Sequence, residues 1–364
     1  MGLGAVAAAF LALLAVVVFL LVKVQRLSGK MDETPRRENN DAVKKRRLST
    51  ASSGIIEFAD SEVKEICVEN WDSDGDGELS RDEAAGVKDL GANFKNNKNI
   101  RSFDELRYFT GLELLERSAF NQCSNLQHVM LPDQITVIDD FAFLQCESLK
   151  EIQFPAKLEK IGVYGFNECH SLTTVSFPRS LKSISDAAFG ACGNLTSVKF
   201  DDSSVTLGPW CFTSCPKLND VTLGQCVECL EDGVFFECVS LRSVKIPDSA
   251  KSLGADIFHN CHQLSDVYVG DGVTSIGKAA FYGDDSLKVL SLPSVDVFKA
   301  GLAFASNSLE KQLIETVVIR HGDAGKYSFD RIFEKVDERC RYIVPKGTLQ
   351  SYLDKGYKNV EETK

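Results

Sequence analysis

Residues 166–188 read FNECHSLTTVSFPRSLKSISDAA, and Phe189 begins the same pattern again 23 residues after Phe166. Phenylalanine recurs at this spacing without interruption at Phe120, Phe143, Phe166, Phe189, Phe212, Phe235, Phe258 and Phe281. A further unit keeps the spacing at Phe304. An unbroken period of this length is typical of a solenoid, because one unit alone cannot bury its apolar face. The repeats are therefore expected to stack along one axis, with the phenylalanine of each unit filling the interior between the two sides of its coil.

Each unit also carries a short apolar stretch of the form Leu-x-x-Val-x-Phe, as at Leu172, Val175 and Phe177. Its β-branched and aromatic residues suit a β-strand that pairs with the next unit. Proline, glycine or aspartate follows each of these stretches, as at Pro178, and marks the end of the strand. The sequence predicts an α/β fold, a leucine-rich repeat solenoid with a parallel β-sheet.

A cysteine column runs through the repeats, three residues after each phenylalanine. It comprises Cys123, Cys146, Cys169, Cys192, Cys215, Cys238 and Cys261, and Asp284 and Asn307 follow in the next two units. In leucine-rich repeats this column points inward and satisfies backbone groups of the turn. The thiols are therefore expected to be buried and reduced, not paired in disulfides. Outside the column, Cys226 and Cys229 form an isolated C-x-x-C, with neither a thioredoxin-like context nor a second pair of zinc ligands.

The acidic stretch at residues 72–83 reads DSDGDGELSRDE and matches the calcium loop of an EF-hand. It has carboxylates at the first, third and fifth places, glycine at the sixth and glutamate at the twelfth, which wraps oxygen ligands around one cation. We expect one Ca²⁺ bound by the side chains of Asp72, Asp74, Asp76 and Glu83, by the backbone carbonyl of Glu78, and by Ser80 directly or through water. In the alternative interpretation, Ser80 and Glu83 form only a capping box for the next helix.

Apolar residues at helical spacing flank this loop: Val63, Ile66, Cys67 and Trp71 before it, and Ala84, Val87 and Leu90 after it. EF-hand loops usually pair, and residues 93–105 (NFKNNKNIRSFDE) are interpreted as a decayed partner loop with Ile100 opposite Leu79. Asparagine and lysine stand in its ligand places. One loaded site beside an empty one indicates a structural calcium ion, not a cooperative switch.

The front of the chain differs sharply from the rest. Residues 3–22 (LGAVAAAFLALLAVVVFLLV) are uncharged and apolar, and this length suffices for a helix to cross a bilayer. A cleaved signal peptide would carry a basic start and a small-x-small site, and neither is present, so residues 1–22 are predicted to be a retained transmembrane anchor. Residues 23–53 contain nine Lys/Arg and four Asp/Glu, a net charge of +5, and are predicted to form a flexible spacer that contacts anionic lipid.

The remaining residues are strongly acidic. The whole chain carries −11 and residues 23–53 carry +5, so residues 54–364 carry −16. This balance argues against nucleic-acid binding by the repeats.

The segment from Ile55 to Leu114, followed by the Phe-x-x-Cys-x-x-Leu repeats, resembles the BspA-like leucine-rich repeat proteins. The closing stretch CRYIVPKGTLQSY, residues 340–352, resembles the strand-then-helix end cap of that family. The resemblance covers about residues 54–350 and implies a bacterial surface or secreted protein that adheres to host or bacterial ligands. No cysteine precedes Cys67, so we do not expect a lipoprotein attachment site in this chain.

Two indications of membrane orientation conflict. Basic residues after the span, with none before it, place the repeats in the cytoplasm by the positive-inside rule. The resemblance implies repeats outside the cell. We expect a single-pass membrane protein whose repeats lie outside the cytoplasm, at the cell surface.

These observations divide the chain into a transmembrane anchor (1–22), a basic linker (23–53), an EF-hand-like calcium module (54–107), leucine-rich repeats (108–309) and a C-terminal cap (310–364). No catalytic constellation is visible, so the expected function is binding or adhesion to a protein ligand, and not catalysis. Among the side chains expected to project from the strand face, Met130, Lys245 and Tyr268 are the candidate ligand contacts. The alternatives are a calcium-dependent membrane-tethered regulator and a thiol enzyme using Cys226 and Cys229.

Overall fold

The computed structural model describes residues 54–364 except 203, 299–302, 305–313, 325–332 and 334–335. The predicted membrane segment, residues 3–22, and the basic linker, residues 23–53, lie outside the described residues. In the part that is described, no helix is both long and apolar enough to cross a membrane. Gly54–Lys364 form one compact unit, and the helices and strands described here belong to it.

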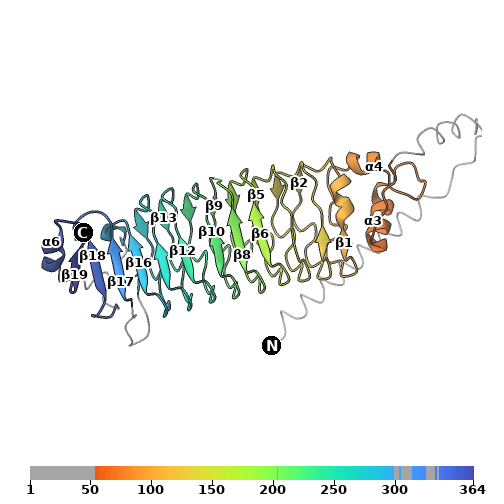
Figure 1. Cartoon of the computed structure of the whole chain (residues 1–364). Coiled ribbons are helices and arrows are strands. Elements are labelled where there is room, and N and C mark those ends of the chain that lie inside the picture. Colours follow the sequence, from red (N-terminus) through yellow and green to blue (C-terminus); the bar gives the residue numbers. More distant parts are fainter. Residues whose placement is uncertain (1–53, 203, 299–302, 305–313, 325–332, 334–335) are drawn as a thin grey trace, which may run out of the picture. The chain divides into compact units, whose positions relative to one another are not determined.

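The Leu-x-x-Val-x-Phe stretches form the predicted parallel strands (Figure 1). They are β3 (His128–Val129), β6 (Thr174–Phe177), β8 (Ser197–Phe200), β10 (Asp220–Thr222), β12 (Ser243–Lys245), β14 (Asp266–Tyr268) and β16 (Val289–Leu292). Equivalent residues of neighbouring repeats face each other, so that Val175 lies opposite Val198 and Phe177 opposite Phe200. The valine and phenylalanine columns point inward and their neighbours outward, which confirms the predicted strand and its register.

A second parallel sheet runs along the other side of the repeats. Its strands are β2 (Leu114–Leu115), β4 (Val137–Ile138), β5 (Lys160–Ile161), β7 (Ser183–Ile184), β9 (Thr206–Leu207), β11 (Cys229–Leu230), β13 (Ser252–Leu253) and β15 (Ser275–Ile276), and they pair in sequence order. Each strand buries one aliphatic side chain and turns the other residue outward. Most coils therefore carry a strand on both sides, whereas residues 149–154 form no strand and leave a gap in the first side.

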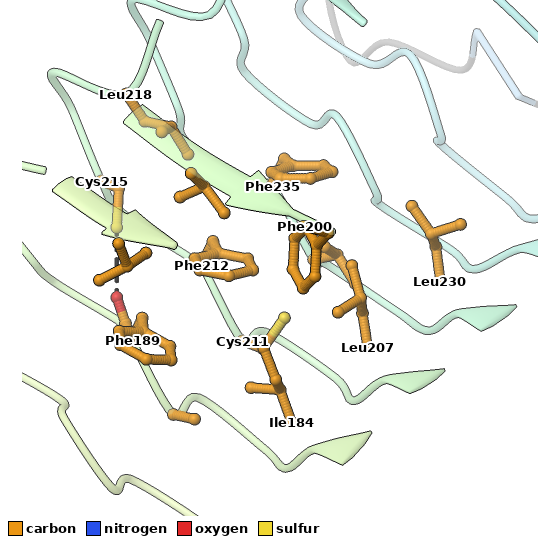
Figure 2. Close-up of a cluster of buried hydrophobic side chains, with 14 of the residues drawn as sticks. Ile184, Phe189, Phe200, Leu207, Cys211, Phe212, Cys215, Leu218, Leu230 and Phe235 are labelled. Carbon is orange, nitrogen blue, oxygen red and sulfur yellow. Dashed lines mark hydrogen bonds between the residues drawn. The ribbon is translucent and has the colours of Figure 1, made fainter. Parts of the chain in front are cut away.

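The phenylalanine column fills the space between the two sheets, as predicted. Phe189 is fully buried, with its ring centroid 5.1 Å from Phe166 and 5.5 Å from Phe212. The plane of the Phe189 ring is nearly parallel to both, at 4° to Phe166 and 16° to Phe212. Figure 2 shows Phe189, Phe212 and Phe235 in the core. A continuous aromatic stack of this kind couples each repeat to its two neighbours.

The cysteine column satisfies backbone carbonyls of the turns. Cys215 Sγ, for example, donates to the carbonyl oxygen of Phe189 at 3.2 Å (Figure 2). The same bond, from each thiol to the phenylalanine 26 residues earlier, recurs at Cys146, Cys169, Cys192, Cys238 and Cys261. Burial raises the pKa of five thiols of the column, to about 12 at Cys123; the others are Cys146, Cys169, Cys238 and Cys261. All 12 cysteines lie in the described residues and none forms a disulfide, which agrees with the predicted reduced ladder.

Asp284 takes the cysteine place in the eighth repeat and is fully buried, with its Oδ1 accepting a hydrogen bond from the Cys261 backbone N–H at 2.9 Å. Burial raises the pKa of this carboxyl well above its ordinary value. The folded chain therefore keeps a proton there that the unfolded chain loses once the pH rises above about 4.

We expect the free energy of unfolding to fall as the pH rises above about 4, because folding must then either retain that proton or bury a charge. Asp284→Asn keeps an acceptor for Cys261 and removes the charge, so it should stabilise the protein at pH 8 by about 1–3 kcal/mol. Denaturant titrations of both proteins from pH 4 to pH 8 provide the measurement. A difference between the two proteins that does not grow with pH would show that Asp284 does not titrate in this way.

The solenoid begins earlier than the predicted boundary at residue 108. Strand β1 (Ser102–Phe103) pairs in parallel with β3, and the 3₁₀-helix η1 (Asp104–Tyr108) follows it. Phe94 lies 5.4 Å from the ring of Phe120 and its carbonyl accepts the bond from the Cys123 thiol. Residues 93–105 thus form the first coil of the solenoid, which differs from their interpretation as a decayed calcium loop.

The C-terminal residues continue the sheet and then cap it. Strand β17 (Thr316–Ile319) pairs with β16 and places Val317 opposite Leu290, so this repeat is four residues longer than the 23-residue period. Strand β18 (Arg341–Val344), helix α6 (Leu349–Asp354) and strand β19 (Val360–Glu362) follow. The predicted strand-then-helix cap is present, with β19 as an additional edge strand. A short 3₁₀-helix, η2 (Val295–Val297), follows β16.

Candidate functional site

The acidic loop lies between helix α3 (Ser61–Trp71) and helix α4 (Arg81–Gly86), as expected for its flanking segments. Asp72 shapes the loop: its Oδ1 accepts from Gly75 N at 2.7 Å and its Oδ2 from Gly77 N at 2.9 Å. Gly75 and Gly77 have φ of +73° and +87°, which only glycine adopts without strain. Carboxylate oxygens of Asp72, Asp74 and Asp76 lie within 4.8 Å of one another.

Glu83, the predicted twelfth-place ligand, does not join this cluster of three. Its Oε1 accepts from Ser73 N at 2.8 Å and its Oε2 from Ser80 N at 2.9 Å. Ser80 caps α4 in return, so the capping box weighed as the alternative is present. Partial burial raises the pKa of Glu83, but the hydrogen bonds from Ser80 and Ser73 outweigh it and lower the pKa to about 2. The side chain of Glu78 pairs with Lys64, with 2.6 Å between Oε2 and Nζ.

The donor set nevertheless suits a hard cation, since three carboxylates converge on a loop bent by two glycines. The loop is braced by the segment that precedes α3: Ile56 N donates to Leu79 O at 2.9 Å, and Arg81 N donates to Gly54 O at 2.7 Å. The predicted partner of Leu79, Ile100, is instead buried in the core of the unit. The brace therefore comes from residues 54–56 and not from a second calcium loop.

The strand face carries the outward side chains predicted from the sequence. Met130 is 40% exposed, Lys245 is exposed and Tyr268 is half-buried. Most of the others are polar and exposed, such as Gln153 and Thr222. The strand face offers few apolar anchors along most of its length.

One groove interrupts this polar face at its N-terminal end. It has a volume of about 510 Å³ and is lined by Arg107, Tyr108, Thr110, Met130, Leu131, Asp133, Gln134, Gln153, Phe154, Pro155 and Ala156. A smaller hollow of about 240 Å³ adjoins it and shares Met130 and Gln153. The groove thus combines apolar, aromatic and charged side chains in one concave place.

Two arginines order the rim of this groove. Arg107 Nη1 donates to Met130 Sδ at 3.1 Å, and its Nη2 donates to Tyr108 Oη, also at 3.1 Å. The guanidinium of Arg81 lies 4.4 Å from the centre of the Tyr108 ring. The hydrogen bond from Arg107 holds the pKa of Tyr108 below its usual range. Neither arginine was predicted as a site residue, because each lies outside the repeat columns.

The other two candidate contacts, Lys245 and Tyr268, lie together at the opposite end of the face. Lys245 Nζ is 5.6 Å from the centre of the Tyr268 ring, and Arg320 covers the same ring at 4.3 Å. Arg320 is held in turn by Asp271, with 3.0 Å between Nε and Oδ1. The hydrogen bond from Arg320 lowers the pKa of Asp271. Arg320 was missed in the sequence because it follows the offset repeat, where the column register is broken.

Cys226 and Cys229 are both half-buried. Burial and the nearby carboxylates of Glu231 and Glu228 raise the pKa of Cys229. A nucleophilic or metal-binding cysteine needs a lowered pKa, so Cys229 gives no support to the thiol-enzyme alternative.

Comparison with known proteins extends these observations. The family described as BspA type leucine rich repeat region (6 copies) matches residues 92–219 and 205–330. No curated protein matches the chain.

Several solved structures are similar. A leucine-rich repeat protein from Bacteroides ovatus is 20% identical, with 76% of this chain and 87% of that chain covered and a TM-score of 0.39. A leucine rich cell surface protein from Faecalibacterium prausnitzii is 25% identical, with 51% and 61% covered and a TM-score of 0.34. The leucine rich repeat protein of T. pallidum is 27% identical, with 49% and 70% covered and a TM-score of 0.34.

The family match begins at residue 92, close to Phe94, where the structure places the first coil. Because the matched segments span more than half of the 364 residues, this chain belongs to the BspA-type leucine-rich repeat family.

Proposed function

We propose that this protein is a membrane-tethered binding protein that holds a protein ligand on its strand face, with the groove at Met130 as the main contact. The lining of this groove is the main support for the proposal. It offers a half-exposed methionine and buried apolar residues such as Leu131 and Phe154, with Arg107 and Tyr108 at the rim. Aromatic residues, methionine and arginine are enriched at interface hot spots, whereas the rest of the face is polar.

The ring of Tyr268, between Lys245 and Arg320, provides a second contact on the same face. A ligand that reaches both places would span most of the repeats, and two modest contacts on one ligand reinforce each other. Many copies on one membrane would add further avidity.

The proposal predicts that Met130→Glu weakens binding by at least tenfold, because it puts a charge into the apolar part of the groove. A phage-displayed random peptide library panned against the full chain supplies the probe, and the enriched peptides are then titrated against each variant. Thr222→Glu is the matched control, since it adds the same charge at an exposed position of β10.

The double variant Lys245→Ala, Tyr268→Ala locates the second contact. Loss of affinity in this double variant as well would show that the ligand spans both places. Unchanged affinity in Met130→Glu and in the double variant, with folding intact, would move the binding site off the strand face.

We also propose that residues 3–22 anchor the chain as a single span and that residues 54–364 lie outside the cytoplasm. The apolar run and the family support this arrangement, since one similar structure is that of a cell surface protein. Protease added to intact cells should then degrade the repeats. Protection of the repeats until the cells are lysed would place them in the cytoplasm.

The acidic loop is proposed to hold one calcium ion, with Asp72, Asp74 and Asp76 as ligands and Glu83 joining them when the ion binds. Because the loop is braced by residues 54–56 and packs next to the first coil, the ion would stabilise the N-terminal end of the solenoid. The alternative, a calcium-dependent regulator, requires that calcium change the affinity for the ligand and not only the stability.

A further inference from the structure

A row of aromatic side chains lies on the edge formed by the turns that lead from the second sheet into the strand face. It consists of Trp210, Phe236, His259 and Tyr282, which we call the aromatic row. Successive ring centroids are 5.2, 4.8 and 4.3 Å apart. Trp210 is the most open of them, 38% exposed, and its ring lies against Gly233, where a Cβ would come within 2.2 Å of Trp210 Cε3. This edge is separate from the strand face and its groove.

The same edge shows, three repeats earlier, what such a ring can bind. Phe141 stacks on Tyr164 at 5.7 Å, and the guanidinium of Arg117 lies 4.8 Å from the centre of the Phe141 ring. Arg117 also pairs with Asp140, with 3.4 Å between Nη1 and Oδ2. The chain itself thus supplies a cation that a ring and a carboxylate hold together.

Moving along the edge by three repeats replaces Phe141 with Trp210 and Arg117 with Asp186. Asp186 is exposed and lies beside the turn that carries Trp210, since Ala187 N donates to Pro209 O at 2.9 Å. The place that holds the internal cation in the earlier repeat therefore holds a carboxylate here. The ring of Trp210 has an anionic neighbour where Phe141 has a cationic one.

The surroundings of the aromatic row add to this negative charge. Residues 231–237 contribute three carboxylates and no lysine or arginine. Glu231 and Asp232 are exposed, and Glu237 is half-buried. The unit of residues 54–364 has a net charge of −16, so a second copy of the chain would bring like charges together at this edge.

We propose that the aromatic row is a second docking surface, for a protein segment that carries exposed lysine or arginine side chains. A guanidinium or ammonium group of the partner would lie over the Trp210 ring and pair with the Asp186 carboxylate. Within this chain, Arg117 makes the same two kinds of contact, with the Phe141 ring and the Asp140 carboxylate. Indole is the strongest of the aromatic side chains in attracting a cation, and the carboxylates Glu231 and Asp232 add charge complementarity.

The test is a titration of the full chain with a fluorescent hexa-arginine peptide in 150 mM salt, with hexa-glutamine as the neutral peptide. Trp210→Ala leaves the net charge unchanged and should weaken hexa-arginine binding roughly fivefold. Leu353→Ala truncates an exposed apolar side chain of helix α6, away from this edge, and should leave the affinity as it was.

Asp186→Arg is the sharper variant, because it restores the internal cation of the earlier repeat and should block the site more strongly than Asp186→Asn. Equal affinity of the wild type, Trp210→Ala and Asp186→Arg would mean that the peptide binds only through diffuse charge, and would overturn the proposal. Tight binding of a neutral oligosaccharide that depends on Trp210 but not on Asp186 would overturn it as well. Met130→Glu should leave this binding intact, so the outcome is independent of the strand-face proposal.

Discussion

Replacing Phe189 with alanine is expected to lower the free energy of unfolding by about 3–5 kcal/mol. The side chain is fully buried and stacks between Phe166 and Phe212, and the edge of its ring meets Phe177 at 5.5 Å. Alanine would leave a cavity in the middle of the stack, where both sheets hold the backbone in register and prevent the neighbours from filling it. Chemical denaturation followed by circular dichroism measures the effect.

Ser176→Ala is the matched control for this prediction. It truncates an exposed side chain one residue from the buried Phe177, so the free energy of unfolding should change by less than about 0.5 kcal/mol. A loss below half a kcal/mol in Phe189→Ala itself would contradict the assignment of the phenylalanine column to the core.

Calcium is expected to stabilise the protein by about 2.7 kcal/mol when its free concentration is a hundred times the dissociation constant, since a ligand that binds only the folded state shifts the equilibrium by this amount. Asp72→Ala should abolish that gain. Asp72 is the key position because it also accepts bonds from Gly75 and Gly77 and so orders the loop. Thermal unfolding in calcium and in a chelator gives the shift, and calorimetric titration gives the affinity.

Two further variants separate the metal from the helix cap. Ser80→Ala removes the hydroxyl that accepts from Glu83 N at 3.2 Å, so it should cost about 0.5–2 kcal/mol with or without calcium. Glu83→Gln should weaken calcium binding. It should also flatten the loss of stability between about pH 4.5 and pH 2. Because the carboxyl pKa of Glu83 is lower in the folded chain, its ionised form stabilises the fold above the unfolded pKa, and this contribution is lost as the pH falls through about 2. If millimolar calcium produced neither heat of binding nor a shift of the thermal unfolding curve, the acidic loop would not be a calcium site.

The repeat columns were predictable because each has one chemical requirement that recurs at a fixed spacing. Phe189 and Cys215 were assigned to the interior from the sequence, and the structure buries both. The second sheet was not predicted: a strand such as Thr206–Leu207 has only two residues, too few for an alternating pattern to be recognised. Its one inward leucine indicates burial but not a strand.

Features whose register or pairing depends on contacts between distant parts of the chain could not be predicted from the sequence. Asn93–Glu105 resembled a partner loop because Ile100 is apolar at the expected place, but Phe94 and Phe103 pack onto Phe120 and draw this segment into the first coil. Arg320 contacts Tyr268 across about fifty residues and follows an offset repeat. No local spacing could have indicated that contact.

Only part of the candidate site on the strand face could be predicted from the sequence. The alternation along the strands correctly turned Met130, Lys245 and Tyr268 outward, because a strand of known register fixes the direction of each side chain. The groove could not be read in the same way. Its rim depends on Arg81 in helix α4 and Arg107 in η1, which tertiary packing positions.

The buried thiol ladder has a consequence for how long the protein would survive in an oxidising compartment. In the folded chain the column thiols are buried and hydrogen-bonded to backbone carbonyls, so oxidants cannot reach them readily. Once the chain unfolds, all 12 cysteines become accessible, and in an oxidising compartment they would be trapped in non-native disulfides. Each unfolding event would then be irreversible, so the lifetime of the protein would depend on its unfolding rate and not on its equilibrium stability.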